Sequence, residues 1–242
     1  MSTNKYKKGE FGYWWTVTKG NEDIEGAEYE DDIDASNIFL TSLRGSPRRV
    51  TGDFWCHNNE LTSLKHCPES VSKKFWCHNN ELTSLKHCPG NIGHSFLCNR
   101  NHLTSLEYCP SAIVDSFWCS DNNLTSLDHC PKTIGGDFCC HNNQLTSLKC
   151  CPEIISRSFW CSGNKLTDLA HAPRNVGESF ACEGNPIEDT LSEIIVNNII
   201  AKNYQISEGT RLTLAELEIE KRRRNIQRQL GPFAITVPGR KI

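Results

Sequence analysis

Apolar residues in the middle of the chain recur with a period of 21 residues. Six complete copies fill residues 54–179, and a seventh copy begins at residue 180. The phenylalanines that open the copies are Phe54, Phe75, Phe96, Phe117, Phe138, Phe159 and Phe180. A fixed period of this length predicts a solenoid, in which each coil packs only on its two neighbours.

The copy at 75–95 indicates how one coil is built. Alternation over 75–77 predicts a short strand whose first and third side chains face the core, so that Trp76 faces outward. The amide of Asn80 is expected to satisfy backbone groups left unpaired between adjacent coils. The later core positions of this copy are Leu82, Leu85 and Ile92.

The repeat resembles the leucine-rich repeat, and in particular the short repeats of bacterial and tailed-phage proteins. The pattern L-x-x-L-x-L-x-x-N-x-L maps onto this chain with Phe and Cys in two leucine positions and no leucine at the first. The matching positions are Ser72, Phe75, Cys77, Asn80 and Leu82. The resemblance implies an α/β-type repeat solenoid, with a short parallel β-sheet on the concave face and a mostly irregular convex side.

The segments outside the full copies predict three parts of the chain. Residues 1–32 are expected to cap the N-terminal end, with a strand or hairpin arm at 11–17. A solenoid is expected over 33–187, with one degraded, six full and one partial repeat. Residues 188–242 are expected to form a C-terminal helical cap and basic tail, with helices at 190–201 and about 210–230 and a short strand or loose tail at 233–237.

Fourteen cysteines suggest a disulfide framework until they are placed in the repeat. Seven follow each Phe by two residues, five precede a proline, and Cys139 and Cys150 stand outside both columns. Buried free cysteine behaves as a small apolar side chain. With no signal peptide and no apolar run of membrane-spanning length, the expected compartment is the cytoplasm, and the columns are expected to be reduced thiols.

Catalytic and metal-binding motifs are absent from the sequence. The nine histidines show no zinc-type spacing with cysteine, and no P-loop or nucleophile-elbow motif occurs. We therefore expect no enzyme activity, no metal and no cofactor. Histidines stacked on adjacent coils, such as His57 over His78, are expected about 4.8 Å apart.

Columns that face outward are the candidates for function. Large exposed apolar patches mark interaction sites, and tryptophan is enriched in binding hot spots. The column one residue after Phe contains Trp55, Trp76, Leu97, Trp118, Cys139 and Trp160. The flanking candidates are His57, His78, Asn99, His141, Asp53, Lys74 and Asp137. We expect the closest contacts where the Trp column is interrupted, at Leu97 and Cys139. The alternative is that a terminal segment covers the column or that its rings pack on each other.

Two charged segments add further hypotheses. The acidic run at 22–34 is either a solvated loop or a patch for a basic partner. The predicted second C-terminal helix carries a basic cluster at Lys221, Arg222, Arg223, Arg224 and Arg228. That cluster is either a solvated helix face, a docking element for an acidic protein or, less in keeping with a net charge of −3, a nucleic-acid contact.

The sequence thus predicts a non-enzymatic module that binds another protein. The phage and bacterial resemblance suggests an inhibitor or modulator of a host protein. The alternative from a different class is a structural component that self-associates, for example as a homodimer, through its C-terminal helix.

Overall fold

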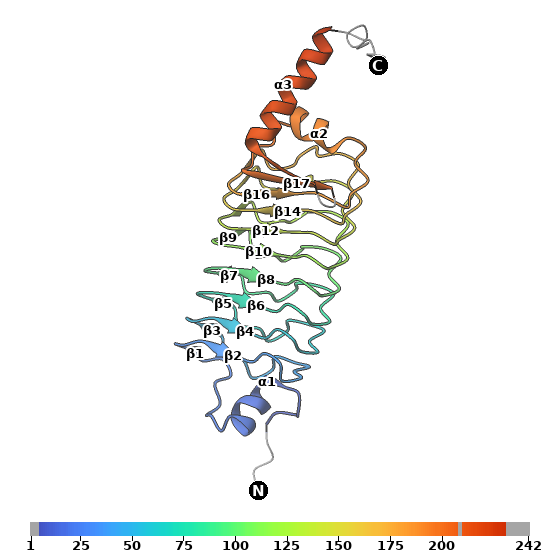
Figure 1. The fold of residues 1–242 in the computed structure, drawn as a ribbon. Helices are drawn as coiled ribbons and strands as arrows, with labels where there is room; N and C mark the ends of the chain where they lie inside the picture. The colour runs from blue at the N-terminus through green and yellow to red at the C-terminus, as the bar shows by residue number, and fades with distance from the viewer. Residues whose placement is uncertain (1–4, 208–209, 231–242) are drawn as a thin grey trace, which may run out of the picture.

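Stacked coils form a column in the computed structural model, which describes residues 5–207 and 210–230 (Figure 1). One strand from each coil joins a ten-stranded sheet, in which successive Phe positions pair in parallel register. The strands contributed by the coils are β2 (Ile33–Asp34), β4 (Phe54–Trp55), β6 (Phe75–Trp76), β8 (Phe96–Leu97), β10 (Phe117–Trp118), β12 (Phe138–Cys139), β14 (Phe159–Trp160) and β16 (Ser179–Ala181). The leucine-rich repeat architecture expected from the sequence is therefore present.

A second set of short strands lies directly beside the ten-stranded sheet, where the sequence predicted none (Figure 1). These strands form two four-stranded parallel sheets, and the rest of each coil is irregular, as expected. The first contains β1 (Glu28–Tyr29), β3 (Arg49–Val50), β5 (Ser70–Val71) and β7 (Asn91–Ile92). The second contains β9 (Ala112–Ile113), β11 (Thr133–Ile134), β13 (Ile154–Ile155) and β15 (Asn175–Val176). Each strand is two residues long, and in every one except β1 a buried Val or Ile, such as Ile113, anchors the segment to the core.

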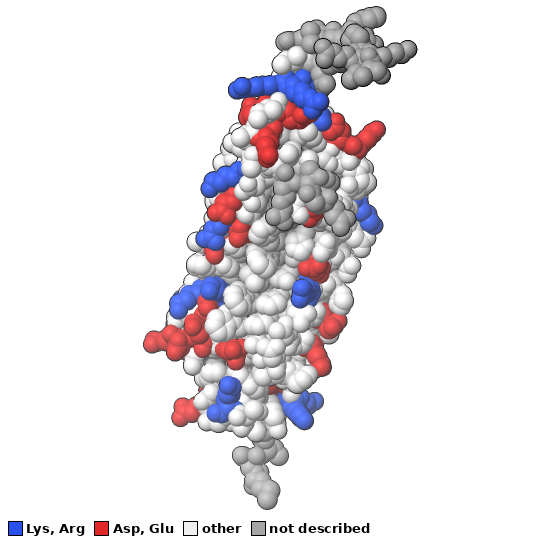
Figure 2. All heavy atoms as spheres, in the orientation of Figure 1, with Lys and Arg blue, Asp and Glu red and all other residues white. Residues whose placement is uncertain are grey.

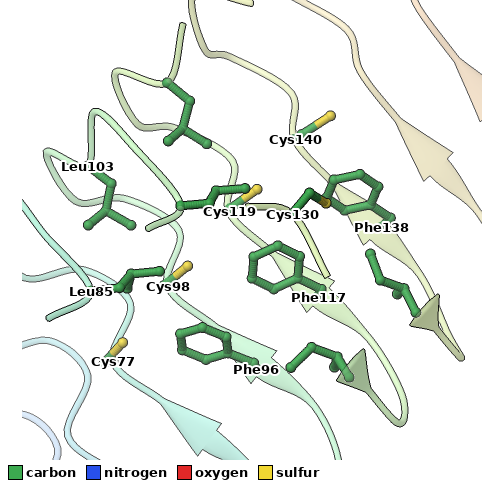
Figure 3. Close-up of a cluster of buried hydrophobic side chains, with 14 of the residues drawn as sticks. Cys77, Leu85, Phe96, Cys98, Leu103, Phe117, Cys119, Cys130, Phe138 and Cys140 are labelled. Carbon is green, nitrogen blue, oxygen red and sulfur yellow. The ribbon is translucent and has the colours of Figure 1, made fainter. Parts of the chain in front are cut away.

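The core consists of columns that run through the coils, as Figure 3 shows for the middle of the solenoid. Phe117 is fully buried between Phe96 and Phe138, with ring centroids at 5.6 and 5.7 Å. The leucine pair of each full copy is also fully buried. All fourteen cysteines are free thiols, and those two residues after Phe face the core. The predicted inward columns are confirmed.

The asparagine after each strand bonds to two coils, as predicted. Asn101 Nδ2 donates to the carbonyl oxygens of Cys98 in its own coil and Cys77 in the preceding coil, at 3.0 and 3.1 Å. Its Oδ1 accepts the backbone N–H of Leu82 at 2.9 Å. This side chain therefore satisfies buried backbone groups that neither coil could satisfy alone.

The prediction of a strand or hairpin arm at 11–17 is wrong. The segment forms α1 (Phe11–Tyr13) and a π-helical turn, η1 (Trp14–Thr18). The helical turns place Phe11, Trp14 and Trp15 together, with the Phe11 ring 6.1 Å from that of Phe54. Covering the open end of the Phe column outweighs the β propensity of these aromatic residues.

The C-terminal region also departs from the expected helices. The first helix is shorter, α2 (Thr190–Val196), and the chain then forms β17 (Asn203–Ser207) and β18 (Thr210–Thr213). β17 pairs with β16 in parallel and β18 pairs with β17 antiparallel, so this hairpin extends the sheet beyond the last coil.

The second C-terminal helix, α3 (Leu214–Leu230), begins later than expected. Its start is a capping box, in which the N–H of Glu216 bonds to Thr213 Oγ1 and the Glu216 carboxylate accepts the Thr213 N–H. The strand expected at 233–237 lies outside the described residues. No helix in the described part of the chain has the length and apolarity needed to cross a membrane.

Candidate protein-binding face

Side chains that alternate with the core columns form the outer surface of the ten-stranded sheet. We call this surface the Trp face. Its central column pairs in register from coil to coil and contains Trp55, Trp76, Leu97, Trp118, Cys139 and Trp160. The four tryptophans are half-buried, whereas the flanking Phe54 and Cys56 are fully buried. The predicted outward direction of the Trp column is therefore correct.

The tryptophans pack in two pairs. The rings of Trp55 and Trp76 stack with centroids 5.6 Å apart. Trp118 and Trp160 are two coils apart, yet their rings meet edge-on at 6.5 Å. Cys139 lies between them in the column and is only 1% exposed. The expectation of close partner contact at Cys139 is thus wrong, because the small side chain is buried at this break in the column.

His57 and His78 stack beside the first Trp pair. Their ring centroids are 4.4 Å apart and the rings are nearly parallel at 12°. Burial, with smaller effects from His57 and Arg100, lowers the pKa of His78 to about 4, and burial also lowers the pKa of His57. Both rings are therefore neutral at pH 7. No group of three or more potential metal ligands occurs among the described residues.

Unpaired polar atoms are concentrated on the Trp face. In the described part of the chain, six buried side-chain nitrogen or oxygen atoms have no hydrogen-bond partner, and all six belong to this face. They are the Nε1 atoms of Trp55, Trp76 and Trp118, the Nδ1 atoms of His57 and His78, and Oδ1 of Asn99. A buried polar group without a partner costs about 1–3 kcal/mol where water does not reach it. The face thus has donors and acceptors that the chain itself leaves unsatisfied.

Charged residues at the edge of the face have structural roles. Asp53 is 7% exposed and its carboxylate accepts the backbone N–H of Lys74 at 2.8 Å. Asp137 accepts the N–H of Ser158 in the same way at 2.9 Å. The Lys74 ammonium lies 5.5 Å from the centre of the Trp76 ring. These three candidates therefore support the neighbouring coil or the Trp column.

The C-terminal end of the face is hollow. One cavity of about 390 Å³ lies between Trp160 and the β17–β18 hairpin, and a second of about 320 Å³ extends from Trp160 towards His141 and Glu183. Both are lined by Ala181 and Gln205. The change from Trp to Ala in the column was visible in the sequence. The contribution of Gln205 was not, because it depends on the unexpected hairpin.

The predicted basic cluster on α3 is divided between internal and exposed side chains. Arg224 Nη1 is 3.0 Å from the Asp189 carboxylate and 2.7 Å from Ser192 Oγ, which ties α3 to α2. Arg222 and Arg223 are exposed, Lys221 is half-buried, and the side chain of Arg228 lies outside the described residues. Figure 2 shows the basic side chains gathered at the α3 end of the molecule.

Part of the acidic N-terminal run also pairs within the chain. Lys5 binds both Asp23 and Glu25, and the Tyr6 hydroxyl donates to Asp23 at 2.6 Å. In the described part of the chain, the N-terminal segment lies at the end of the column, beneath β2, and does not extend along the Trp face (Figure 1).

Comparisons with known proteins agree with the repeat architecture. No family model matches the chain, and no curated protein matches it. Among solved structures, YopM from Yersinia enterocolitica WA-314, a leucine-rich repeat protein, superposes with a TM-score of 0.52 at 20% sequence identity. The match covers 66% of this chain and 39% of YopM, so the chain spans well under half of that protein. The fold of this chain is that of a leucine-rich repeat protein.

Proposed function

We propose that the chain is a non-enzymatic module that binds another protein through the Trp face. The observation that carries this proposal is the group of six unpaired polar atoms on that face. Every residue concerned is half-buried, so these atoms lie just beneath the surface that a partner would contact. A partner that pairs with them recovers free energy that the isolated chain lacks.

Other features support a protein as the partner. The half-buried tryptophans offer large, rigid apolar surfaces of the kind found in binding hot spots. Fourteen unbridged cysteines fit a reducing compartment, such as the cytoplasm of a bacterial cell or infected bacterial host. Inhibition or modulation of a host protein is the role suggested by the resemblance to phage and bacterial repeats.

Affinity capture from a bacterial lysate tests the proposal. The wild type is compared with a Trp76→Ala/Trp118→Ala variant and with Tyr108→Ala, a control that removes an exposed aromatic ring away from the Trp face. We expect the double variant to lose a protein that the wild type and the control retain. Capture of the same proteins by all three, with similar melting temperatures, would show that the Trp face is not the binding surface.

Self-association through α3 is a second candidate. Ile219 and Ile226 are seven residues apart on this helix and are 67% and 55% exposed, whereas Leu217 is buried against the rest of the chain. The two isoleucines form a narrow apolar strip suited to a second copy of the helix. Light scattering tests this function. A dimer that dissociates when Ile219 is replaced by Glu supports it, and a protein that stays monomeric at high concentration excludes it.

A further inference from the structure

The hollow around Trp160 differs from the rest of the Trp face. Trp55 and Trp76 cover each other, but the position paired with Trp160 on its C-terminal side is Ala181. In the described part of the chain, Trp160 has one ring contact, the edge-on contact with Trp118. The indole therefore borders both cavities without a stacked neighbour.

A carboxylate stands on the far side of the second cavity. Glu183 lies in the turn that follows β16, and its side chain lines the second cavity together with Trp160. Both of its carboxylate oxygens lie 2.6 Å from Gln205 Nε2. This amide orients the carboxylate but does not neutralise it, and no described Lys or Arg side chain lines either cavity.

The spacing between the indole and the carboxylate fits one planar cation. Trp160 pairs with Ala181, and a residue two positions further along the chain in a nearly extended path has its Cβ atom roughly 8 Å from that of Trp160. A guanidinium group between them can lie within about 6 Å of the indole centre and still pair with the carboxylate. Arginine suits this geometry better than lysine, because its planar group stacks on aromatic rings and pairs with both carboxylate oxygens.

We propose that the hollow receives an arginine side chain of the partner protein, stacked on Trp160 and paired with Glu183. This inference rests on the proposed function and specifies the chemistry of the partner at one point of the Trp face. His141 and Ser162, which line the same cavity, offer polar contacts to the backbone beside that arginine.

The test is a titration of the full-length chain with the peptide acetyl-Gly-Arg-Gly-amide, followed by the indole N–H resonances in ¹⁵N-labelled protein. The resonance of Trp160 is assigned from a Trp160→Phe variant. The control peptide replaces arginine with citrulline, which has nearly the same shape but no charge. We expect the Trp160 resonance to shift with the arginine peptide, and about tenfold weaker binding of the citrulline peptide.

Matched variants separate the carboxylate from general charge. Glu183→Gln is expected to reduce binding of the arginine peptide to the level of the citrulline peptide. Glu107→Gln, which neutralises an exposed carboxylate away from the hollow, is expected to leave binding unchanged. Equal binding of the two peptides, or no effect of Glu183→Gln in a folded variant, would overturn the proposal.

Arg211 requires its own control, because its backbone pairs with Gln205 across the hairpin. If the Trp160 resonance responds only in an Arg211→Ala variant, the hollow binds the chain's own arginine and the proposal is wrong. Trp118 touches the Trp160 ring, so the capture experiment is repeated here with Trp76→Ala alone, which changes a distant coil. Loss of the partner there without a response at Trp160 would therefore reject the arginine site and retain the protein-binding function.

Discussion

Replacement of Asn122 by alanine tests whether the asparagine column holds the coils together. Asn122 lies in the middle of the solenoid and is 7% exposed. Its Nδ2 donates to the carbonyl oxygens of Cys98 and Cys119, both at 3.1 Å, and its Oδ1 accepts the N–H of Leu103 at 2.9 Å. Alanine removes all of these bonds and leaves buried backbone groups of two adjacent coils unpaired.

The expected loss of stability follows from the number of hydrogen bonds that the substitution removes. An unsatisfied buried donor or acceptor costs about 1–3 kcal/mol, and water entering the space left by the amide recovers part of this cost. Asn122→Ala should therefore lower the free energy of unfolding by about 3–5 kcal/mol. The loss should exceed that of a typical point substitution, because the side chain serves an interface between repeats as well as its own coil.

Urea unfolding followed by circular dichroism and tryptophan fluorescence measures this loss. The matched control is Asn123→Ala, which changes the adjacent exposed asparagine and should shift stability by less than about 0.5 kcal/mol. If both variants lose less than about 1 kcal/mol, the inter-coil hydrogen bonds do not have the importance assigned to them.

Two further predictions concern protonation and thiol chemistry. Between the unfolded pKa of 6.5 and the folded pKa of about 4, the unfolded chain protonates His78 more readily than the folded chain. Stability should therefore fall by about 1–2 kcal/mol as the pH decreases through this window, the partial exposure of the ring limiting the effect. Denaturation at pH 7 and 4.5 measures this, and a His78→Asn variant with an unchanged pH dependence would contradict it. Burial raises the pKa of the column thiols such as Cys98, whereas Cys150 is exposed. A thiol reagent should thus modify one cysteine rapidly in the folded chain, and Cys150→Ser should remove this rapid phase of the reaction. Rapid modification of several cysteines in the wild type would contradict the burial of the cysteine columns.

The repeat explains why so much of the solenoid could be predicted. The same residue types occupy the same positions in every copy. The assignment of Phe75, Cys77 and Leu82 to the core is therefore supported by all of the copies and not by one segment alone. The terminal segments lack this redundancy. The aromatic residues at 11–17 have strand propensity, but the need to cover Phe54 favours helical turns that group Phe11, Trp14 and Trp15.

The candidate site was predicted less completely, because alternation gives the direction of a side chain and not its neighbours. The column containing Trp76 and Trp118 was placed correctly on the outer face. Its pairing was not predicted, since the contact between Trp118 and Trp160 depends on rotamers that bring rings together across two coils. Cys139 lies between these two tryptophans in the column, and its burial could not be read from the strand pattern.

The sequence by itself determined the coil, its inward columns and the outward direction of the Trp column, because the same residue pattern recurs every 21 residues. Tertiary structure alone decided which positions on that face are open. The β17–β18 hairpin adds Gln205 beside Glu183, and the adjacent Ala181 leaves space beside Trp160. These residues meet because the sheet continues past the last repeat, where the period no longer specifies the neighbours.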